Sequence, residues 1–180
     1  MKTTILVAAL LAAAVAPAAA ADCAALYRQH LATDLKLSYD QFDQTLGGGF
    51  RALVGQRCHK EAGDLLEAWM HANHKDDESV RWHLAQQRAL QGDYPEALQW
   101  ARGTLDVHED VAKIHLHWND YVLATIAFLQ HDKPALLAAR ERVAAGAMVS
   151  QGDAVNLKFV DSLVKNFDAS YAVASEGIGK

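Results

Sequence analysis

The sequence predicts an all-α protein: stacked antiparallel helical hairpins, arranged as an α-solenoid, with a C-terminal capping helix. Apolar residues recur at helical spacing along most of the 180-residue chain. Gly, Asp and Pro interrupt these stretches at short corners. One corner pattern also returns along the chain, because segment 131–140 resembles segment 92–101 at an offset of 39 residues. A repeat of this length is typical of stacked helical units.

The first 21 residues have the features of a secretory signal peptide. Lys2 precedes the apolar run 5–15, and Pro17 and a stretch of alanines follow. The run is shorter than the roughly 20 residues that cross a bilayer, so a retained anchor is the less favoured alternative. We expect cleavage after Ala20 or Ala21, a periplasmic or secreted location, and one helical-repeat domain over 22–180.

The charge of the chain excludes some classes of partner. The formal net charge is -5, whereas binding to nucleic acid requires clustered Lys and Arg that neutralise phosphates. There is also no basic amphipathic stretch of the kind that lies on a membrane surface. We therefore expect no nucleic-acid partner, and no membrane association after the signal peptide is removed.

The sequence contains two cysteines, Cys23 and Cys58. A single pair in an oxidising compartment usually forms a disulfide. Closing a loop of this length stabilises the fold by about 3–4 kcal/mol in the chain-entropy treatment. Lipidation of Cys23 is disfavoured because Asp22 precedes it, and a catalytic Cys58–His59 pair is disfavoured because sequence neighbours on a helix point apart.

The clearest corner lies in the middle of the chain. Gly92 can end one helix in a left-handed conformation, and Asp93 can cap the next helix with Glu96 three residues further on. Pro95 falls in the first turn, where its missing N–H does no harm. This pattern predicts a turn between two antiparallel helices. The polar face of the preceding helix consists of Gln86, Gln87, Arg88 and Gln91.

The same corner can be aligned with segments on both sides. The matched pairs are Asp93/Asp132, Pro95/Pro134 and Leu98/Leu137 at an offset of 39, and Glu61/Glu96 and Ala62/Ala97 at an offset of 35. The sequence therefore predicts three successive hairpins.

The middle unit resembles a tetratricopeptide repeat. Leu84-Ala85 stands where that family has Leu-Gly, the triplet Gly92-Asp93-Tyr94 is complete, and Ala97 takes the alanine position. Ala101 stands where the family usually has an aromatic residue. The resemblance implies that the first helix of each hairpin lines a concave groove.

The remaining elements follow from periodicity and turn residues. The predicted helices cover 23–33, 49–55, 60–73, 79–91, 95–105, 111–130, 134–145 and 154–167. The predicted loops cover 47–49, 74–78, 106–110 and 150–153. Segment 35–39 alternates and could form a short strand. The last helix is expected to cap the array, and the tail 174–180 to fray.

The expected groove positions carry side chains suited to recognising a peptide. They are Arg51, Trp82, Gln86, Trp118, Tyr121 and Thr125. Aromatic residues and arginine dominate the binding energy at interfaces, so the leading hypothesis is an exported module that holds a peptide or protein partner, without catalysis and without a cofactor. The alternative for the aromatic residues is an ordinary core between hairpins.

A different class of function remains open, an enzyme or a metal-binding protein. His83 and Asp120 fall on the first helices of adjacent hairpins and could form an acid–base pair. His71 and His74 are three residues apart, close to acidic residues 76–78, and could chelate zinc or copper. A solvated polar linker explains the second pair equally well.

Overall fold

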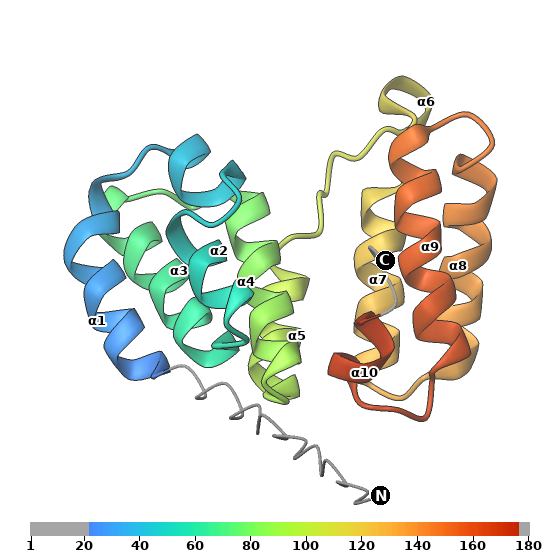
Figure 1. Ribbon diagram of the computed structural model, residues 1–180. Coiled ribbons are helices and arrows are strands. Elements are labelled where there is room, and N and C mark those ends of the chain that lie inside the picture. Colours follow the sequence, from blue (N-terminus) through green and yellow to red (C-terminus); the bar gives the residue numbers. More distant parts are fainter. Residues whose placement is uncertain (1–21, 177–180) are drawn as a thin grey trace, which may run out of the picture.

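The computed structural model describes residues 22–176, and the regular elements of this range are all helices (Figure 1). The predicted signal peptide and residues 177–180 lie outside the described residues. The all-α prediction is confirmed for 22–176. No described helix is long and apolar enough to cross a membrane.

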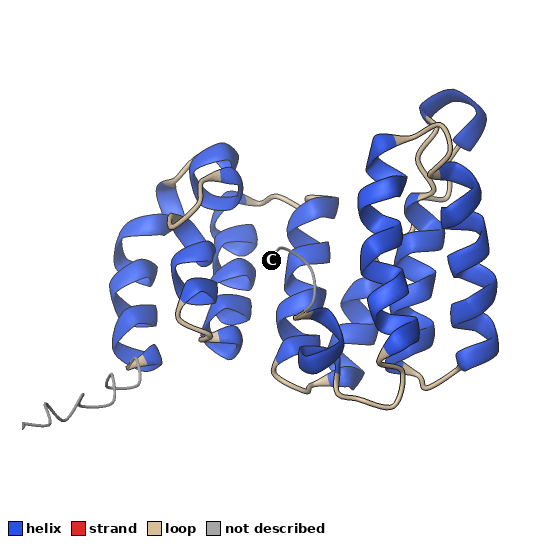
Figure 2. Cartoon of the chain, turned by 45° about the vertical axis from the view of Figure 1, so that its right-hand side comes forward, coloured by secondary structure: helices blue, strands red, loops and turns tan. Residues whose placement is uncertain are grey.

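The first half of the described chain contains α1 (Cys23–Thr33), the 3-10 helix η1 (Asp34–Lys36), the π-helix η2 (Asp40–Gln44), α2 (Gly49–Gly55), α3 (His59–Asn73), α4 (Glu78–Leu90) and α5 (Tyr94–Arg102). The second half contains α6 (Val111–Ile114), α7 (Trp118–Leu129), α8 (Lys133–Gly146), α9 (Gln151–Lys165) and α10 (Tyr171–Ser175). Helices that follow one another in the chain pack together, α3 on α4 on α5 and α7 on α8 on α9 (Figures 1 and 2).

The corners between α2 and α3, α4 and α5, and α7 and α8 share one backbone geometry, which the corner at His74 between α3 and α4 also adopts. In each, a residue with positive φ follows a helix, and the next residue donates its N–H to the carbonyl oxygen five residues back, as in a Schellman motif. The left-handed residues are Arg57 (φ 60°), Gly92 (φ 90°) and His131 (φ 57°). The N–H to carbonyl bonds that follow them run from Cys58 to Leu53 (3.0 Å), from Asp93 to Arg88 (2.9 Å) and from Asp132 to Ala127 (2.8 Å). The chain reversals expected at Asp93 and Asp132 are therefore present.

The prediction of one helix over 111–130 is wrong. Helix α6 ends at Ile114, His115 is left-handed (φ 50), and α7 begins at Trp118. The buried carboxylate of Asp153 accepts hydrogen bonds from the backbone N–H of His117 at 3.0 Å and from its ring Nδ1 at 2.9 Å. Asp153 thereby takes up a backbone donor that a continuous helix would have used.

The short strand predicted at 35–39 is also wrong. This segment contains the last two residues of the 3-10 helix η1, the extended residue Leu37, and Tyr39 in a helical conformation. Side chains of α3 satisfy two of its carbonyl groups. Trp69 Nε1 donates to the Leu37 carbonyl and Asn73 Nδ2 to the Leu35 carbonyl, both at 3.0 Å. No strand partner is needed once these acceptors are filled.

The predicted disulfide between Cys23 and Cys58 is present, with the two Cα atoms 5.4 Å apart. It ties the first residue of α1 to the N-cap of α3. In the neighbouring core, the rings of Phe42 and Trp69 stack with their centroids 4.8 Å apart. The first half of the described chain therefore has its own packed interior and a covalent link.

Candidate functional site

A cleft of about 410 Å³ lies between the two halves of the described chain. Its first wall comes from α2, the corner before α3, the first residue of α3, and α4. It consists of Val54, Arg57, His59, Gln86, Gln87 and Leu90. Its second wall comes from α9 and the C-terminal segment, and consists of Phe159, Tyr171, Ala172, Ser175 and Glu176. Of the predicted groove residues, Gln86 lines this cleft.

Gln87 is the buried polar group of the first wall, with 5% of its surface exposed. Its Oε1 lies 2.9 Å from His59 Nδ1. Because an amide oxygen only accepts hydrogen bonds, His59 Nδ1 is the donor in this pair. The contact fixes the orientation of the Gln87 amide, whose Nε2 group has no hydrogen-bond partner within residues 22–176.

An ion pair joins the two walls at the mouth of the cleft. Arg57 Nη2 lies 3.2 Å from Glu176 Oε1, and the two side chains are 80% and 59% exposed. Arg57 is the left-handed residue of the first corner, and Glu176 directly follows α10. Neither residue was predicted as part of a site, because their 119-residue separation carries no local signal in the sequence.

Helix α10 is fixed against the rest of the molecule by a buried tyrosine. The backbone N–H of Tyr171 donates to Tyr94 Oη at 2.9 Å, and its ring packs near Phe128 and Phe159. Burial raises the pKa of Tyr171 well above its ordinary value of 10.0, so its phenol stays neutral over the physiological range. The second wall is therefore held in place by apolar packing.

Three of the predicted groove residues lie in the core. Trp82, Tyr121 and Thr125 are 4%, 7% and 2% exposed. Trp118 packs edge-on to Trp82, with ring centroids 5.5 Å apart. These are the positions expected under the alternative of a core between hairpins, and the open cleft is lined by a different set of side chains.

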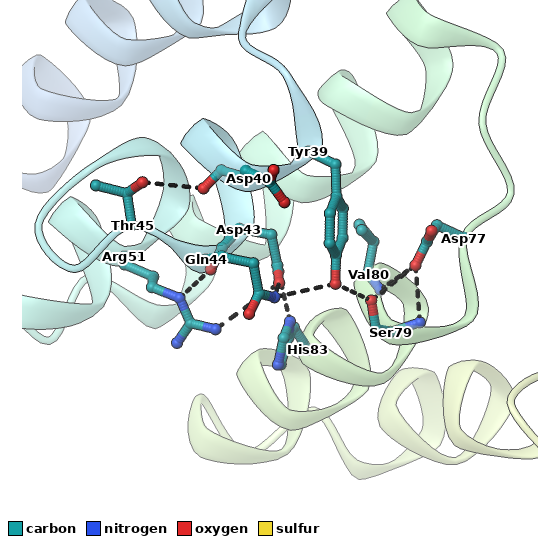
Figure 3. A network of polar contacts seen from close by, with 10 residues as sticks. All are labelled: Tyr39, Asp40, Asp43, Gln44, Thr45, Arg51, Asp77, Ser79, Val80 and His83. Carbon is teal, nitrogen blue, oxygen red and sulfur yellow. Dashed lines mark hydrogen bonds and ion pairs between the residues drawn. The ribbon is translucent and has the colours of Figure 1, made fainter.

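Arg51, the sixth predicted groove residue, belongs to a polar network around Asp43 (Figure 3). Its Nε donates to the Asp43 backbone carbonyl, and its Nη2 lies 3.8 Å from Asp43 Oδ2. The fully buried Asp43 carboxylate also lies 2.6 Å from His83 Nδ1 and accepts from Gln44. The network joins η2 and α2 to α4.

The charge of Asp43 depends on these neighbours. Burial alone would raise the pKa of its carboxyl group. The hydrogen bond from His83, together with the positive charges of His83 and Arg51, outweighs burial and lowers the pKa below its ordinary value of 3.8. Asp43 is therefore an ionised, satisfied buried group that holds three elements together.

The His83–Asp120 pair of the alternative hypothesis does not form. His83 pairs with Asp43, whereas Asp120 Oδ1 lies 2.5 Å from Arg142 Nε. A carboxylate on Nδ1 of a histidine is the arrangement of a catalytic Asp–His pair, which also needs a reacting group beside the ring. The nearby Ser79 hydroxyl, however, is engaged by Asp77 at 2.7 Å and by the Tyr39 hydroxyl at 2.6 Å (Figure 3). These hydrogen bonds of the Ser79 hydroxyl stabilise the N-terminus of α4.

The histidines of the alternative metal site lie at the end of α3. His74 is the left-handed C-cap of that helix, and both His71 and His74 border a shallow hollow beside Trp100. Within 22–176, the one group of three or more potential ligand side chains that converge is Cys23, Cys58 and Glu61, and its two sulfurs are bonded to each other. The acidic residues 76–78 do not join His71 and His74 in such a group.

Comparison of the chain with protein-family models, with curated proteins and with solved structures returns no match.

Proposed function

We propose that this protein is an exported binding module that holds a peptide or protein partner in the cleft between its two halves, without catalysis. The observation that carries the proposal is the buried Gln87 amide, which His59 orients and which opens on the cleft. A buried polar group that is oriented but not fully paired is costly unless a ligand or water completes its hydrogen bonds.

The arrangement of helices supports the same interpretation. The corners within the hairpins are spaced by 35 and 39 residues, from Arg57 to Gly92 to His131, and the corner at His74 joins the first hairpin to the second. We interpret the hairpins α2–α3, α4–α5 and α7–α8 as tetratricopeptide-like units. In such an array the first helices face a common concave side, and two of the three, α2 and α4, supply residues to the first wall of the cleft.

Export is part of the proposal. The Cys23–Cys58 disulfide fits an oxidising compartment. Asp22 caps α1 by accepting a hydrogen bond from the Ala25 N–H at 2.9 Å, so cleavage after Ala20 or Ala21 would leave the first helix complete. The intact mass of the protein recovered from outside the cytoplasm tests this. A mass that retains residues 1–20 would contradict it.

Selection from a displayed random peptide library tests binding in the cleft. The full chain is the target, and the enriched peptides are then measured against two variants of α10. Ala172→Trp places a large ring in the cleft, whereas Val173→Trp places the same ring on the 56% exposed neighbour outside it. We expect Ala172→Trp to weaken the enriched peptides at least tenfold and Val173→Trp to leave their dissociation constants within about twofold.

Two results would contradict the proposal. Enriched peptides could bind the two tryptophan variants equally well, which would place binding elsewhere on the protein. Alternatively, the library could yield no peptide that binds the full chain.

A further inference from the structure

We infer that the cleft recognises a carboxylate carried by a partly apolar ligand. Gln87 and Arg57 donate to this carboxylate, and Glu176 competes for Arg57 from within the chain. This inference rests on the proposed function and specifies the ligand chemistry of the same cleft.

The first donor is Gln87. Its Oε1 is occupied by His59, and its Nε2 has no hydrogen-bond partner among residues 22–176. Within that range, the buried side-chain atoms that are sealed from solvent and lack a hydrogen bond are Nε of Arg81 and Nε of Arg88. The Gln87 Nε2 is not among them, so it keeps contact with solvent, and Gln87 is one of the residues that line the cleft. An amide nitrogen donates only, and its ligand must therefore present an acceptor.

The second donor is Arg57 at the mouth. Among residues 22–176, this guanidinium pairs with the carboxylate of Glu176, at 3.2 Å. Both side chains are largely exposed, and such pairs contribute little to stability. An incoming carboxylate can therefore replace Glu176 on Arg57 at small cost, whereas a neutral ligand gains nothing from that exchange.

The apolar side chains that line the rest of the cleft favour a ligand with an apolar part. Val54, Leu90 and Phe159 come from both walls of the cleft. Ligand sites are typically apolar surfaces with a few fixed polar groups that set orientation. The carboxylate of such a ligand would lie toward Arg57, and its apolar part would lie against these side chains.

Nuclear magnetic resonance with the ¹⁵N-labelled full chain tests this inference with defined probes. The probes are N-acetyl-phenylalanine, which has a terminal carboxylate, and its amide, which has none. A third probe, N-acetyl-Phe-Glu-amide, carries the carboxylate on a side chain and so separates a chain terminus from an acidic side chain. We expect the carboxylate probes to shift the Gln87 side-chain amide signals and to bind about tenfold or more tightly than the neutral amide, because charged acceptors form stronger hydrogen bonds.

Three variants sharpen the test. Arg57→Gln should abolish the preference for the carboxylate, and Arg102→Gln, at an exposed arginine on α5, should preserve it. Glu176→Gln should strengthen binding about threefold or more, because it removes the internal competitor and its negative charge. Arg57 and Glu176 are exposed, so these changes should leave the fold intact.

The inference is overturned if the neutral amide binds as well as the acid, if Glu176→Gln weakens binding, or if no probe binds at millimolar concentration. Its failure is distinguishable from failure of the proposed function. Library peptides that bind in the cleft without any dependence on a carboxylate would leave the proposed function standing and reject this inference.

Discussion

Arg88 on α4 is a buried cation held by acidic side chains of two neighbouring helices. Its guanidinium lies 2.8 Å from Asp64 and 3.1 Å each from Glu67 and Glu96. Gly63 makes room for it, since a Cβ atom there would lie only 2.8 Å from Arg88 Nη1. One side chain therefore connects α3, α4 and α5.

Replacing Arg88 with Met should lower the free energy of unfolding by about 2–4 kcal/mol, because three carboxylates lose their shared counter-charge. Denaturant titration measures this change. Arg102→Met, at an exposed position on α5, should change stability by less than about 0.5 kcal/mol. Equal effects of the two substitutions would show that the buried cluster contributes nothing.

The lowered pKa of Asp43 predicts how the free energy of unfolding depends on pH. Its pKa is lowered in the folded protein, so its ionised form stabilises the fold above the ordinary value of 3.8, and this contribution is lost as the pH falls through the lowered pKa. The free energy of unfolding should therefore decrease below about pH 5. Asp43→Asn should be less stable at neutral pH and should show a shallower decrease in acid. The same decrease in both proteins would contradict the assigned role.

At the scale of the elements, the corners set the architecture. Gly92 has a φ of 90, which suits glycine, whereas Arg57 adopts the equivalent conformation with a side chain. Gly92→Ala should therefore cost about 1 kcal/mol. Arg57→Gly should raise stability by about 0.5 kcal/mol, since relief of the left-handed conformation exceeds the flexibility that glycine adds to the unfolded chain.

Thermal unfolding of the two variants checks this prediction, with Gly55→Ala as the control. Gly55 lies in α2 without positive φ, and a Cβ atom at this position would meet nothing within 4 Å. Alanine there should stabilise the protein by about 0.5–1 kcal/mol through helix propensity. A gain in stability for Gly92→Ala would refute the shared corner geometry.

The sequence predicted most helices and the corners at Asp93 and Asp132, because caps and glycine turns act over a few residues. It did not predict the break at His115, because the cause is Asp153, which lies 36 residues after His117. Arg88 and Gln87 were placed on a polar, outward face of their helix. Both are buried, since polar partners from α3 meet them.

The candidate site was predicted only in part for the same reason. Gln86, which was predicted to line a groove, lines the cleft. Trp82 and Tyr121 lie in the core instead, because removing the large apolar surface of their rings from water is more favourable than leaving it exposed in a groove. The pairs Asp43–His83 and Arg57–Glu176 join residues 40 and 119 positions apart, and only the folded chain brings them together.

At the scale of the whole molecule, the disulfide fixes the N-terminal helix α1 to the start of α3. Cys23 and Cys58 close a loop over a sequence separation of 35 residues, which corresponds to about 3–4 kcal/mol of stability. Replacing both with Ser should lower the melting temperature clearly, and a reducing agent should do the same to the wild-type protein only. An unchanged melting temperature would contradict a stabilising role for the link.

The cleft between the halves is the proposed binding site, and photo-cross-linking tests it most directly. A photoreactive phenylalanine is placed at Leu90, which lines the cleft, or at Leu137, which is 41% exposed on α8. Each protein is irradiated with a peptide enriched from the library, and adducts are measured by mass. We expect an adduct from position 90 and none from position 137. Adducts from position 137 alone would show that the partner binds outside the cleft.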